Sequence, residues 1–317
     1  MRKAPVSADH PYAGFTGNKS RTYVASAQIA DIVNLAIHLG RPLLVEGEAG
    51  CGKTRLASAI AEELQLGDVV AMTVKSTSQA ADLLYRFDAL RRLQDAQDPL
   101  NLSARSLHPY ISLQALGRAI QQGRPCVVLI DEVDKADIDF PNDLLDVLDR
   151  FEFDIEDLPV EESEACLQSR GFGRHVSAPK GGVKPLVIIT SNREKQLPEP
   201  FLRRCLYVQL DFPTDEAMLA DIVLKNLEAT QEAVSAALIA AAVKRFCEIR
   251  QRGRQLTVQK LPATSELVDW VRVLHWKGRK AEDIATAELD ASDQAILFKV
   301  RDDIRRYSAR TADEAGQ

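Results

Sequence analysis

The chain has 317 residues, enough for one large domain or two smaller ones. Hydrophobic residues make up 45% and charged residues 27% of it, which is ordinary for a soluble globular protein. The formal net charge of −6 argues against a protein that binds nucleic acid over much of its surface, because phosphate contacts dominate that affinity. The 5 cysteines show neither a CxxC pair nor metal-ligand spacing, so we expect no disulfide framework.

The two ends and the hydropathy of the chain give an expectation about its compartment. The opening segment MRKAPVSADHPYAGFTG lacks the apolar core of a signal peptide. No uninterrupted apolar run reaches the roughly 18 residues that a membrane span needs. We therefore expect a cytoplasmic protein that makes no contact with a membrane.

The first two thirds of the chain alternate between strand and helix patterns. An N-terminal extension, residues 1–25, is expected to wrap over the surface, and a helix follows from the cap Ser26 to Gly40. Short runs rich in β-branched residues predict buried parallel strands at 42–45, 69–74, 126–130, 186–189 and 206–210. Helical patterns lie at 54–66, 80–97, 112–121 and 140–150. This alternation predicts an α/β domain over residues 26–213.

The remainder of the chain is helical in pattern. Apolar residues recur at helical spacing over 216–228, 233–250, 265–276 and 293–307. These patterns predict an all-helical subdomain over residues 214–317. A polar insertion, residues 152–184, interrupts the α/β domain, and the alternation in FEFDI suggests that a β-hairpin begins there.

The segment GEAGCGKT matches the phosphate-loop pattern G-x-x-x-x-G-K-[ST] at Gly47, Gly52, Lys53 and Thr54. Glycines let backbone N–H groups turn toward phosphates at a helix N-terminus. Lys53 would reach the β- and γ-phosphates, and the Thr54 hydroxyl would ligate Mg²⁺. The segment therefore predicts a site for ATP and Mg²⁺. Its expected contacts are Gly47, Glu48, Ala49, Gly50, Cys51, Gly52, Lys53, Thr54 and Arg55.

Two carboxylates follow the strand predicted at 126–130. The end of a buried strand places Asp131 at the edge of the sheet where ligands of open α/β sheets bind. Asp131 would bind Mg²⁺, mostly through water, and Glu132 would accept a proton from the attacking water or orient it. We interpret Asp134, Asp137 and Asp139 as a solvated loop, in which Asp134 could touch a neighbouring subunit.

A polar amide and two arginines complete the pattern. Asn192 follows the strand predicted at 186–189 and could hydrogen-bond the γ-phosphate or the attacking water. Arg203 and Arg204 precede the last strand, and a guanidinium suits the negative transition state of phosphoryl transfer. Each of these residues also has a simpler reading, Asn192 as a turn former and the arginines as surface charges.

These motifs, in this order, resemble the AAA+ superfamily: Walker A, Walker B with its acid pair, sensor-1 asparagine, arginine finger and helical lid. Finer features resemble its MoxR-type branch. The segments that carry this resemblance are residues 23–54, 82–97, 191–213 and 264–274. The resemblance covers nearly the whole chain.

The resemblance implies a P-loop core with a five-stranded parallel sheet, order 5-1-4-3-2, and a C-terminal helical lid. It implies a homo-oligomeric, typically hexameric ring whose finger is Arg204, or less favourably Arg203, acting on the neighbour's ATP. It also implies a helix-2 insert within 83–97 and a hairpin within 151–184 that face the pore or a substrate. The implied partners are a protein with a von Willebrand factor A domain and a client protein to be remodelled.

One departure concerns the lid. Many AAA+ proteins carry a sensor-2 arginine at the start of the third lid helix, where this chain has Ser265 and Glu266. Arg272 lies two turns further along and is a poor substitute. We therefore expect closure of the lid to respond to nucleotide in a way that does not use a sensor-2 arginine.

Alternatives of other classes stay open. A nucleic-acid motor would need basic residues facing the pore, and Arg86, Arg91, Arg92 and Arg118 are candidates, although solvated helix faces explain them more simply. A small-molecule kinase would need an acceptor site and a basic lid that the sequence does not show. A nucleotide-gated scaffold with slow turnover is disfavoured by Glu132.

Overall fold

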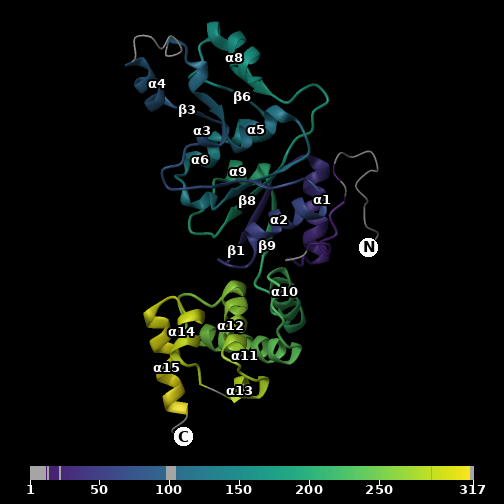
Figure 1. The fold of residues 1–317 in the computed structure, drawn as a ribbon, viewed down its shortest axis with the longest axis vertical. Helices are drawn as coiled ribbons and strands as arrows, with labels where there is room; N and C mark the ends of the chain where they lie inside the picture. The colour runs from purple at the N-terminus through teal and green to yellow at the C-terminus, as the bar shows by residue number, and fades with distance from the viewer. Residues whose placement is uncertain (1–11, 13, 21–22, 98–104, 287, 315–317) are drawn as a thin grey trace. The chain divides into compact units, whose positions relative to one another are not determined.

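The computed structural model in Figure 1 describes residues 12, 14–20, 23–97, 105–286 and 288–314, and its chain forms two units. Among these residues, the first unit takes in the chain up to Gly17, 25–46 and 56–209. The second takes in 18–24, 47–55 and 210–317. Segment 47–55 therefore belongs with the C-terminal helices, and the division before Leu210 lies close to the boundary predicted after Pro213.

A five-stranded sheet is the centre of the first unit, and it confirms all five predicted strands. Its order is β2-β5-β8-β1-β9, which is 5-1-4-3-2 when the strands are numbered as they enter the sheet. The strands are β1 (Leu43–Gly47), β2 (Val70–Thr73), β5 (Val127–Asp131), β8 (Leu186–Ser191) and β9 (Leu206–Leu210). All six residues of β8 are buried, as expected for a parallel strand covered on both faces.

Helices pack beside these strands and confirm most of the predicted pattern. In α1 (Ala27–Leu39) the Ser26 side chain accepts a hydrogen bond from the Ile29 amide, and Gly40 ends the helix with φ +59°. Other helices near the sheet are α2 (Lys53–Glu63), α5 (Ala115–Gln122), α6 (Asp139–Asp143), α7 (Leu145–Arg150) and α9 (Glu199–Arg204). Buried residues of α5 join the same hydrophobic core as β5 and β8.

The single helix predicted over 80–97 is wrong. The structure has a short helix α3 (Ala81–Leu84), a strand β3 (Tyr85–Phe87) and a helix α4 (Ala89–Ala96). The strand β3 pairs antiparallel with β4 (Ile111–Leu113), a partner that local periodicity does not reveal. Asp88 then caps α4 by accepting a hydrogen bond from the Arg91 amide. This excursion occupies the place of the expected helix-2 insert.

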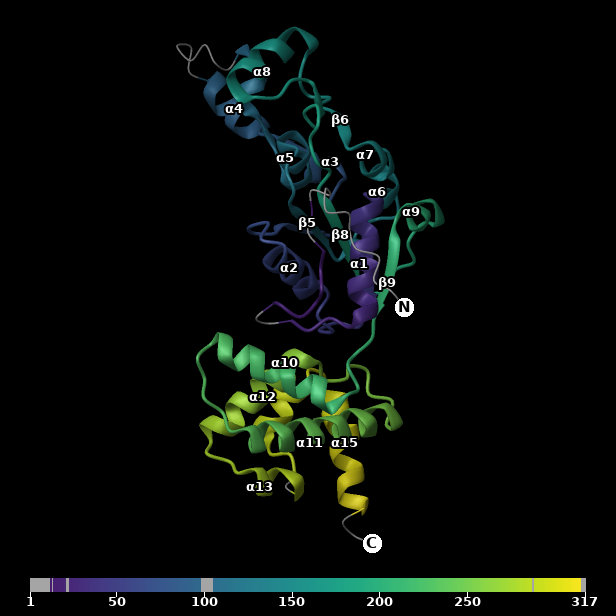
Figure 2. The same ribbon diagram turned by 90° about the vertical axis from the view of Figure 1, so that its right-hand side faces the viewer.

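The insertion predicted over 152–184 contains the expected hairpin. Its strands β6 (Glu152–Asp154) and β7 (His175–Ser177) pair antiparallel, and α8 (Ser163–Arg170) lies between them after the short helix η4 (Val160–Glu162). Both α4 and α8 contact η2 (His108–Tyr110), so the two excursions pack together. They lie at the same end of the first unit in both views (Figures 1 and 2).

The C-terminal part of the second unit is helical, as predicted. Its helices are α10 (Glu216–Ala229), α11 (Ala236–Gln255), α12 (Thr264–Trp276), α13 (Ala281–Thr286), α14 (Ala291–Leu297) and α15 (Arg301–Glu314). Trp270 is buried in their core, and its ring N–H donates to Asp293 at 2.9 Å. The prediction missed α13, and its single helix over 293–307 is wrong because Phe298 takes an extended backbone conformation.

The N-terminal extension is more than a surface wrap. Tyr12 and Phe15 are both buried. The Tyr12 hydroxyl donates to the Lys184 carbonyl at 2.7 Å and accepts from the Leu186 amide at 3.1 Å. Burial raises the pKa of Tyr12 to about 12. This tyrosine therefore ties the extension to the start of β8.

Candidate active site

The neighbouring strands β5 and β8 end at one edge of the sheet and bring two predicted site segments together. Asp131 is the last residue of β5, and its carboxylate accepts a hydrogen bond of 2.5 Å from the Thr190 hydroxyl of β8. The same hydroxyl accepts the Glu132 backbone N–H at 2.9 Å. The strand β1 ends at this edge too, since its residue Glu46 stands in register with Ser191.

Glu132 and Asn192 lie within hydrogen-bond reach of each other. The Asn192 amide donates to one carboxylate oxygen of Glu132 at 3.3 Å, and Lys135 donates to the other at 2.6 Å. The hydrogen bond from Lys135 to Glu132 raises the pKa of the Lys135 ammonium group. Glu132 has φ +62°, a left-handed conformation that is uncommon for residues other than glycine and frequent at functional sites. The carboxylate is thus held by side chains from two segments about sixty residues apart in the chain.

Asp134 corrects the prediction of a solvated loop. Its side chain is only 1% exposed, whereas Asp137 and Asp139 are exposed as predicted. The carboxylate accepts the backbone N–H groups of Asn192 at 3.0 Å and Glu194 at 2.8 Å. Asp134 thereby anchors the turn that carries Asn192. A buried carboxylate needs such donors, because burial without them is costly.

Replacing Asp134 with alanine is expected to lower the free energy of unfolding by about 3 kcal/mol, since two backbone N–H groups lose their carboxylate acceptor. Because the turn also carries Asn192, ATP turnover should fall more than nucleotide affinity. Urea unfolding and steady-state ATPase assays measure both effects. The exposed Asp137→Ala is the matched control and should change neither. An Asp134→Ala protein with the stability and turnover of the starting protein would contradict this anchoring role.

The loop between β1 and α2 has the backbone that its glycines predict. Gly50 and Gly52 have φ of +78° and +99°, which residues with side chains rarely adopt. A Cβ atom on Gly47 would lie 2.3 Å from the carbonyl oxygen of Leu210 and 2.7 Å from the Cys51 sulfur. The loop can therefore take this course only with glycine at these positions.

Lys53 is folded back over its own loop. It is the first residue of α2, is 6% exposed, and donates to the carbonyl oxygens of Gly47 at 2.8 Å and Glu48 at 2.9 Å. Its ammonium group thus lies over the carbonyls of the loop predicted to bind phosphate. An incoming phosphate would have to compete with these two carbonyls for the ammonium.

The other nucleotide contacts predicted for the loop differ in how exposed their side chains are. Thr54 is exposed, as a hydroxyl that ligates a bound cation would need to be. Cys51 is buried, and burial raises the pKa of its thiol, so this cysteine is a packing residue. The Arg55 guanidinium donates to the Asn226 side chain of α10, a contact within the second unit.

The start of α12 lies against the same loop. The Thr264 hydroxyl donates to the Gly50 carbonyl at 2.8 Å, and a Cβ atom on Gly50 would lie 2.4 Å from that of Ala263. The expected sensor-2 position, Ser265, is therefore beside the loop but without a cation. Arg272 instead pairs with Glu232 at 3.0 Å, so it does not replace the missing arginine.

The two finger candidates differ in their surroundings. Arg204, at the end of α9, pairs with Asp149 of α7 at 2.6 Å, and its side chain is 34% exposed. Arg203 is 76% exposed and pairs with Glu199 one turn earlier in the helix. In the described residues both arginines thus form ion pairs with neighbouring helical residues of their own unit.

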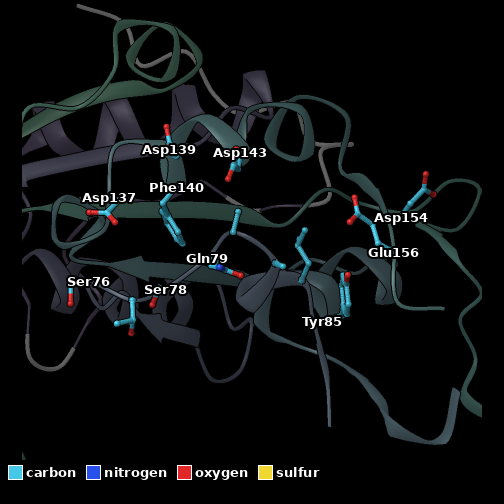
Figure 3. A pocket seen from close by; sticks show the side chains of 14 residues that line it. Ser76, Ser78, Gln79, Tyr85, Asp137, Asp139, Phe140, Asp143, Asp154 and Glu156 are labelled. Carbon is cyan, nitrogen blue, oxygen red and sulfur yellow. The ribbon is translucent and has the colours of Figure 1, made fainter. Parts of the chain in front are cut away.

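A separate cavity of about 640 Å³ lies in the first unit, between the loop after β2 and the hairpin strand β6. Figure 3 shows the side chains that line it. Five of its lining residues are acidic: Asp137, Asp139, Asp143, Asp154 and Glu156. None of the predicted nucleotide contacts lines it. Its wall would therefore repel an anion.

The family description "AAA domain (dynein-related subfamily)" matches residues 42–205, slightly more than half of the chain. The chain belongs to this AAA family. The match runs from β1 to the end of α9 and so includes the phosphate loop, Asp131, Glu132, Asn192 and Arg204. A search of curated proteins gives no match.

Solved structures similar to this AAA protein include the RuvB Holliday junction branch migration motor of Thermotoga maritima. That comparison has 14% identity and a TM-score of 0.45, and it covers 81% of this chain and 65% of the motor. A single-residue variant of the same motor gives 16% identity and a TM-score of 0.45, with coverage of 80% and 64%. The AAA protein thus spans less than two thirds of the length of these chains.

The sequence did not predict the structural roles of two residues of this AAA protein near the candidate site. Asp134 had no usable local signal, because an acid in a polar loop is usually solvated and its two donors lie about sixty residues away in the chain. The other is Arg250 of α11, whose guanidinium donates to the Glu48 carboxylate at 3.2 Å. It lies on the apolar face of α11 with Phe246 and Gly253, where a charge is unusual.

Proposed function

We propose that this chain is a MoxR-type AAA+ ATPase that hydrolyses ATP with Mg²⁺ and uses the energy to remodel a client protein. The observation that carries the proposal is the hydrogen bond between Glu132 and Asn192 at the edge of the sheet where β5 and β8 end. An acid and an amide at this place can activate and orient a water molecule. The strand β1 leads from the same edge into the phosphate loop.

Each group of the chain then has a distinct task. The loop N–H groups and Lys53 bind the β- and γ-phosphates, while oxygens of Thr54 and Asp131 are the donors that Mg²⁺ prefers. The bound Mg²⁺ supplies positive charge that offsets the charge developing on the phosphates. Glu132 accepts the proton of the attacking water, for which its carboxylate must part from Lys135.

The assembly is proposed to be a homo-oligomeric ring, typically a hexamer, in which Arg204 reaches the neighbour's ATP. A fixed guanidinium stabilises the transition state of phosphoryl transfer. In one chain Arg204 is held by Asp149 on α7, so it would exchange this partner for the nucleotide when subunits meet. Arg203 is the second candidate.

Mixing two inactive variants tests both hydrolysis and assembly. Arg204→Ala and Glu132→Gln chains should each hydrolyse ATP poorly, but their mixture should regain activity, because some interfaces then combine an intact finger with an intact Glu132. A phosphate-release assay over a range of mixing ratios measures this. Two control mixtures are made. In one, Arg204→Ala chains are mixed with chains that carry both Arg204→Ala and Lys53→Ala. In the other, Glu132→Gln chains are mixed with chains that carry both Glu132→Gln and Lys53→Ala. A mixture no more active than its components would count against a finger acting between subunits.

The charges near the two excursions favour a protein over a nucleic acid as the client. The acidic cavity beside β6 would repel a phosphate backbone, whose binding depends on neutralisation by lysine and arginine. A protein that carries a von Willebrand factor A domain is the proposed partner, on the resemblance to the MoxR-type branch. The client itself would be captured best by the Glu132→Gln chain held with ATP.

The compartment is proposed to be the cytoplasm, on the sequence grounds given above. In the described part of the chain no helix combines the length and the apolarity that a bilayer crossing requires. The described residues also hold no group of three or more metal-ligating side chains, and the proposed Mg²⁺ site relies on phosphate oxygens as further ligands.

A further inference from the structure

Arg250 is a buried charge on α11 whose surroundings fix its guanidinium in one place. The residue is 5% exposed, and its guanidinium carbon lies 3.4 Å from the centre of the Phe212 ring. It donates to the Pro262 carbonyl and, at 3.2 Å, to the Glu48 carboxylate. Burial lowers the pKa of Arg250, but an arginine stays charged in proteins. Its position therefore carries a permanent positive charge next to the phosphate loop.

Glu48 explains why that charge is useful. It is the second residue of the phosphate loop, where a lone carboxylate would oppose the binding of a polyanion. Its side chain is 60% exposed, whereas that of Arg250 is 6% exposed, so the pair is anchored by the arginine. The net charge contributed by the two residues is zero. The loop can thus keep a carboxylate without losing its attraction for phosphate.

Among the described residues of α10 to α15, no cation occupies the expected sensor-2 position beside this loop. Ser265 occupies the sensor-2 position, and Arg272 is paired with Glu232. The contact of Thr264 with Gly50 adds a neutral hydrogen bond only. Arg250 is accordingly the residue of α11 whose positive charge contacts the loop, through its hydrogen bond to Glu48.

We propose that Arg250 is a positioning residue that neutralises Glu48 and so sets the affinity of the phosphate loop for nucleotide and its preference for triphosphate over diphosphate. The inference rests on the proposed function, because it assumes that the loop binds ATP. The lid would then respond to bound nucleotide through a carboxylate of the loop, and it would not need a sensor-2 arginine at the start of α12.

The proposal predicts effects of opposite sign for the two partners. Glu48→Gln leaves the positive charge of Arg250 uncompensated, so MgATP should bind about fivefold tighter. Arg250→Gln leaves the carboxylate uncompensated, so MgATP should bind about fivefold weaker. The double variant should return to the affinity of the starting protein. MgADP carries less negative charge, so both shifts should be smaller for it.

The experiment titrates each protein with MgATP and with MgADP by calorimetry, at low and at high salt. Because Glu48 is partly exposed, the shifts should shrink as salt rises. Glu282→Gln on α13 and Arg301→Gln on α15 remove the same charges from exposed positions and should leave both affinities unchanged. Arg250→Lys keeps the charge and should bind MgATP much as the starting protein does.

A purely structural contact gives a different pattern. It would make both single variants bind more weakly, or neither, and it would show no difference between MgATP and MgADP; either result overturns the proposal. If Arg250→Gln does not fold, Glu48→Gln and Arg250→Lys still decide. Failure of the proposed function is distinct, because then the starting protein itself would bind neither nucleotide.

Discussion

Replacing Lys53 with alanine should abolish ATP binding at the concentrations at which the starting protein is saturated. The ammonium group at the first position of α2 lies against the carbonyl oxygens of Gly47 and Glu48 in the phosphate loop. Charge-assisted hydrogen bonds to two phosphates contribute about 1.5–3 kcal/mol each, so their loss should weaken binding by roughly 10²- to 10⁴-fold. Hydrolysis should disappear with it.

Equilibrium binding of MgATP by calorimetry measures this effect, and thermal unfolding without nucleotide shows whether the variant is folded. Lys180→Ala, at an exposed position, removes the same charge and should bind ATP normally. The free energy of unfolding of Lys53→Ala should also fall, since the change leaves the buried carbonyl of Gly47 without its donor, and this is why the folded state of the variant is checked separately. A folded Lys53→Ala protein with unchanged ATP affinity would overturn the assignment of the loop.

Replacing Glu132 with glutamine should leave ATP bound but reduce turnover by about 10²- to 10⁴-fold, the usual contribution of a general base. Glutamine has nearly the same shape, and its carbonyl oxygen can still accept the hydrogen bond from Asn192. It cannot accept the proton of the attacking water. The loss should therefore fall on kcat, with affinity for ATP kept or increased.

Single-turnover and steady-state assays separate these quantities, and binding to the variant is measured under the same conditions. Glu161→Gln, an exposed change of the same kind on η4, should hydrolyse ATP at the normal rate. The Glu132→Gln protein should also form longer-lived assemblies with ATP, because it hydrolyses the bound ATP much more slowly. Near-normal turnover by Glu132→Gln would mean that another group takes the proton.

The sheet was predictable because its strands are short, β-branched and buried on both faces. Runs such as 186–189 leave little choice of conformation, since any other would expose a continuous apolar segment or bury unpaired backbone groups. The loop between β1 and α2 was predictable for a similar reason, as its glycines permit backbone angles that other residues rarely adopt. Composition and local stereochemistry suffice for both features.

The two helices that were predicted wrongly contain residues that form contacts with more distant parts of the chain. Residues 80–97 have a helical pattern, but Tyr85–Phe87 gain more by pairing with β4, some twenty-five residues later in the chain. The region 293–307 is broken at Phe298, which packs its ring against Tyr307 at 5.0 Å between centroids. In both places a contact formed only on folding outweighs a weak local preference.

The sequence also predicted which side chains gather at the edge of the sheet, but it missed how they are held. Parallel strands deliver Glu132 and Asn192 to one place, and the structure finds them 3.3 Å apart. Their catalytic roles stay predictions. Asp134 was misjudged because an acid in a polar loop is usually solvated, and only the fold brings two N–H groups to it.

By itself, the sequence determined the five strands of the central sheet, the course of the phosphate loop and the positions of the acids and the amide that follow the strands. These features depend on residues close together in the chain, whose conformational preferences and spacing are fixed by covalent geometry. The tertiary structure alone decided that Asp134 anchors the turn of Asn192 and that Arg250 pairs with Glu48. Those partners lie about sixty and two hundred residues apart in the chain, so only folding brings them together, and burial of Asp134 and Arg250 makes a partner necessary for each.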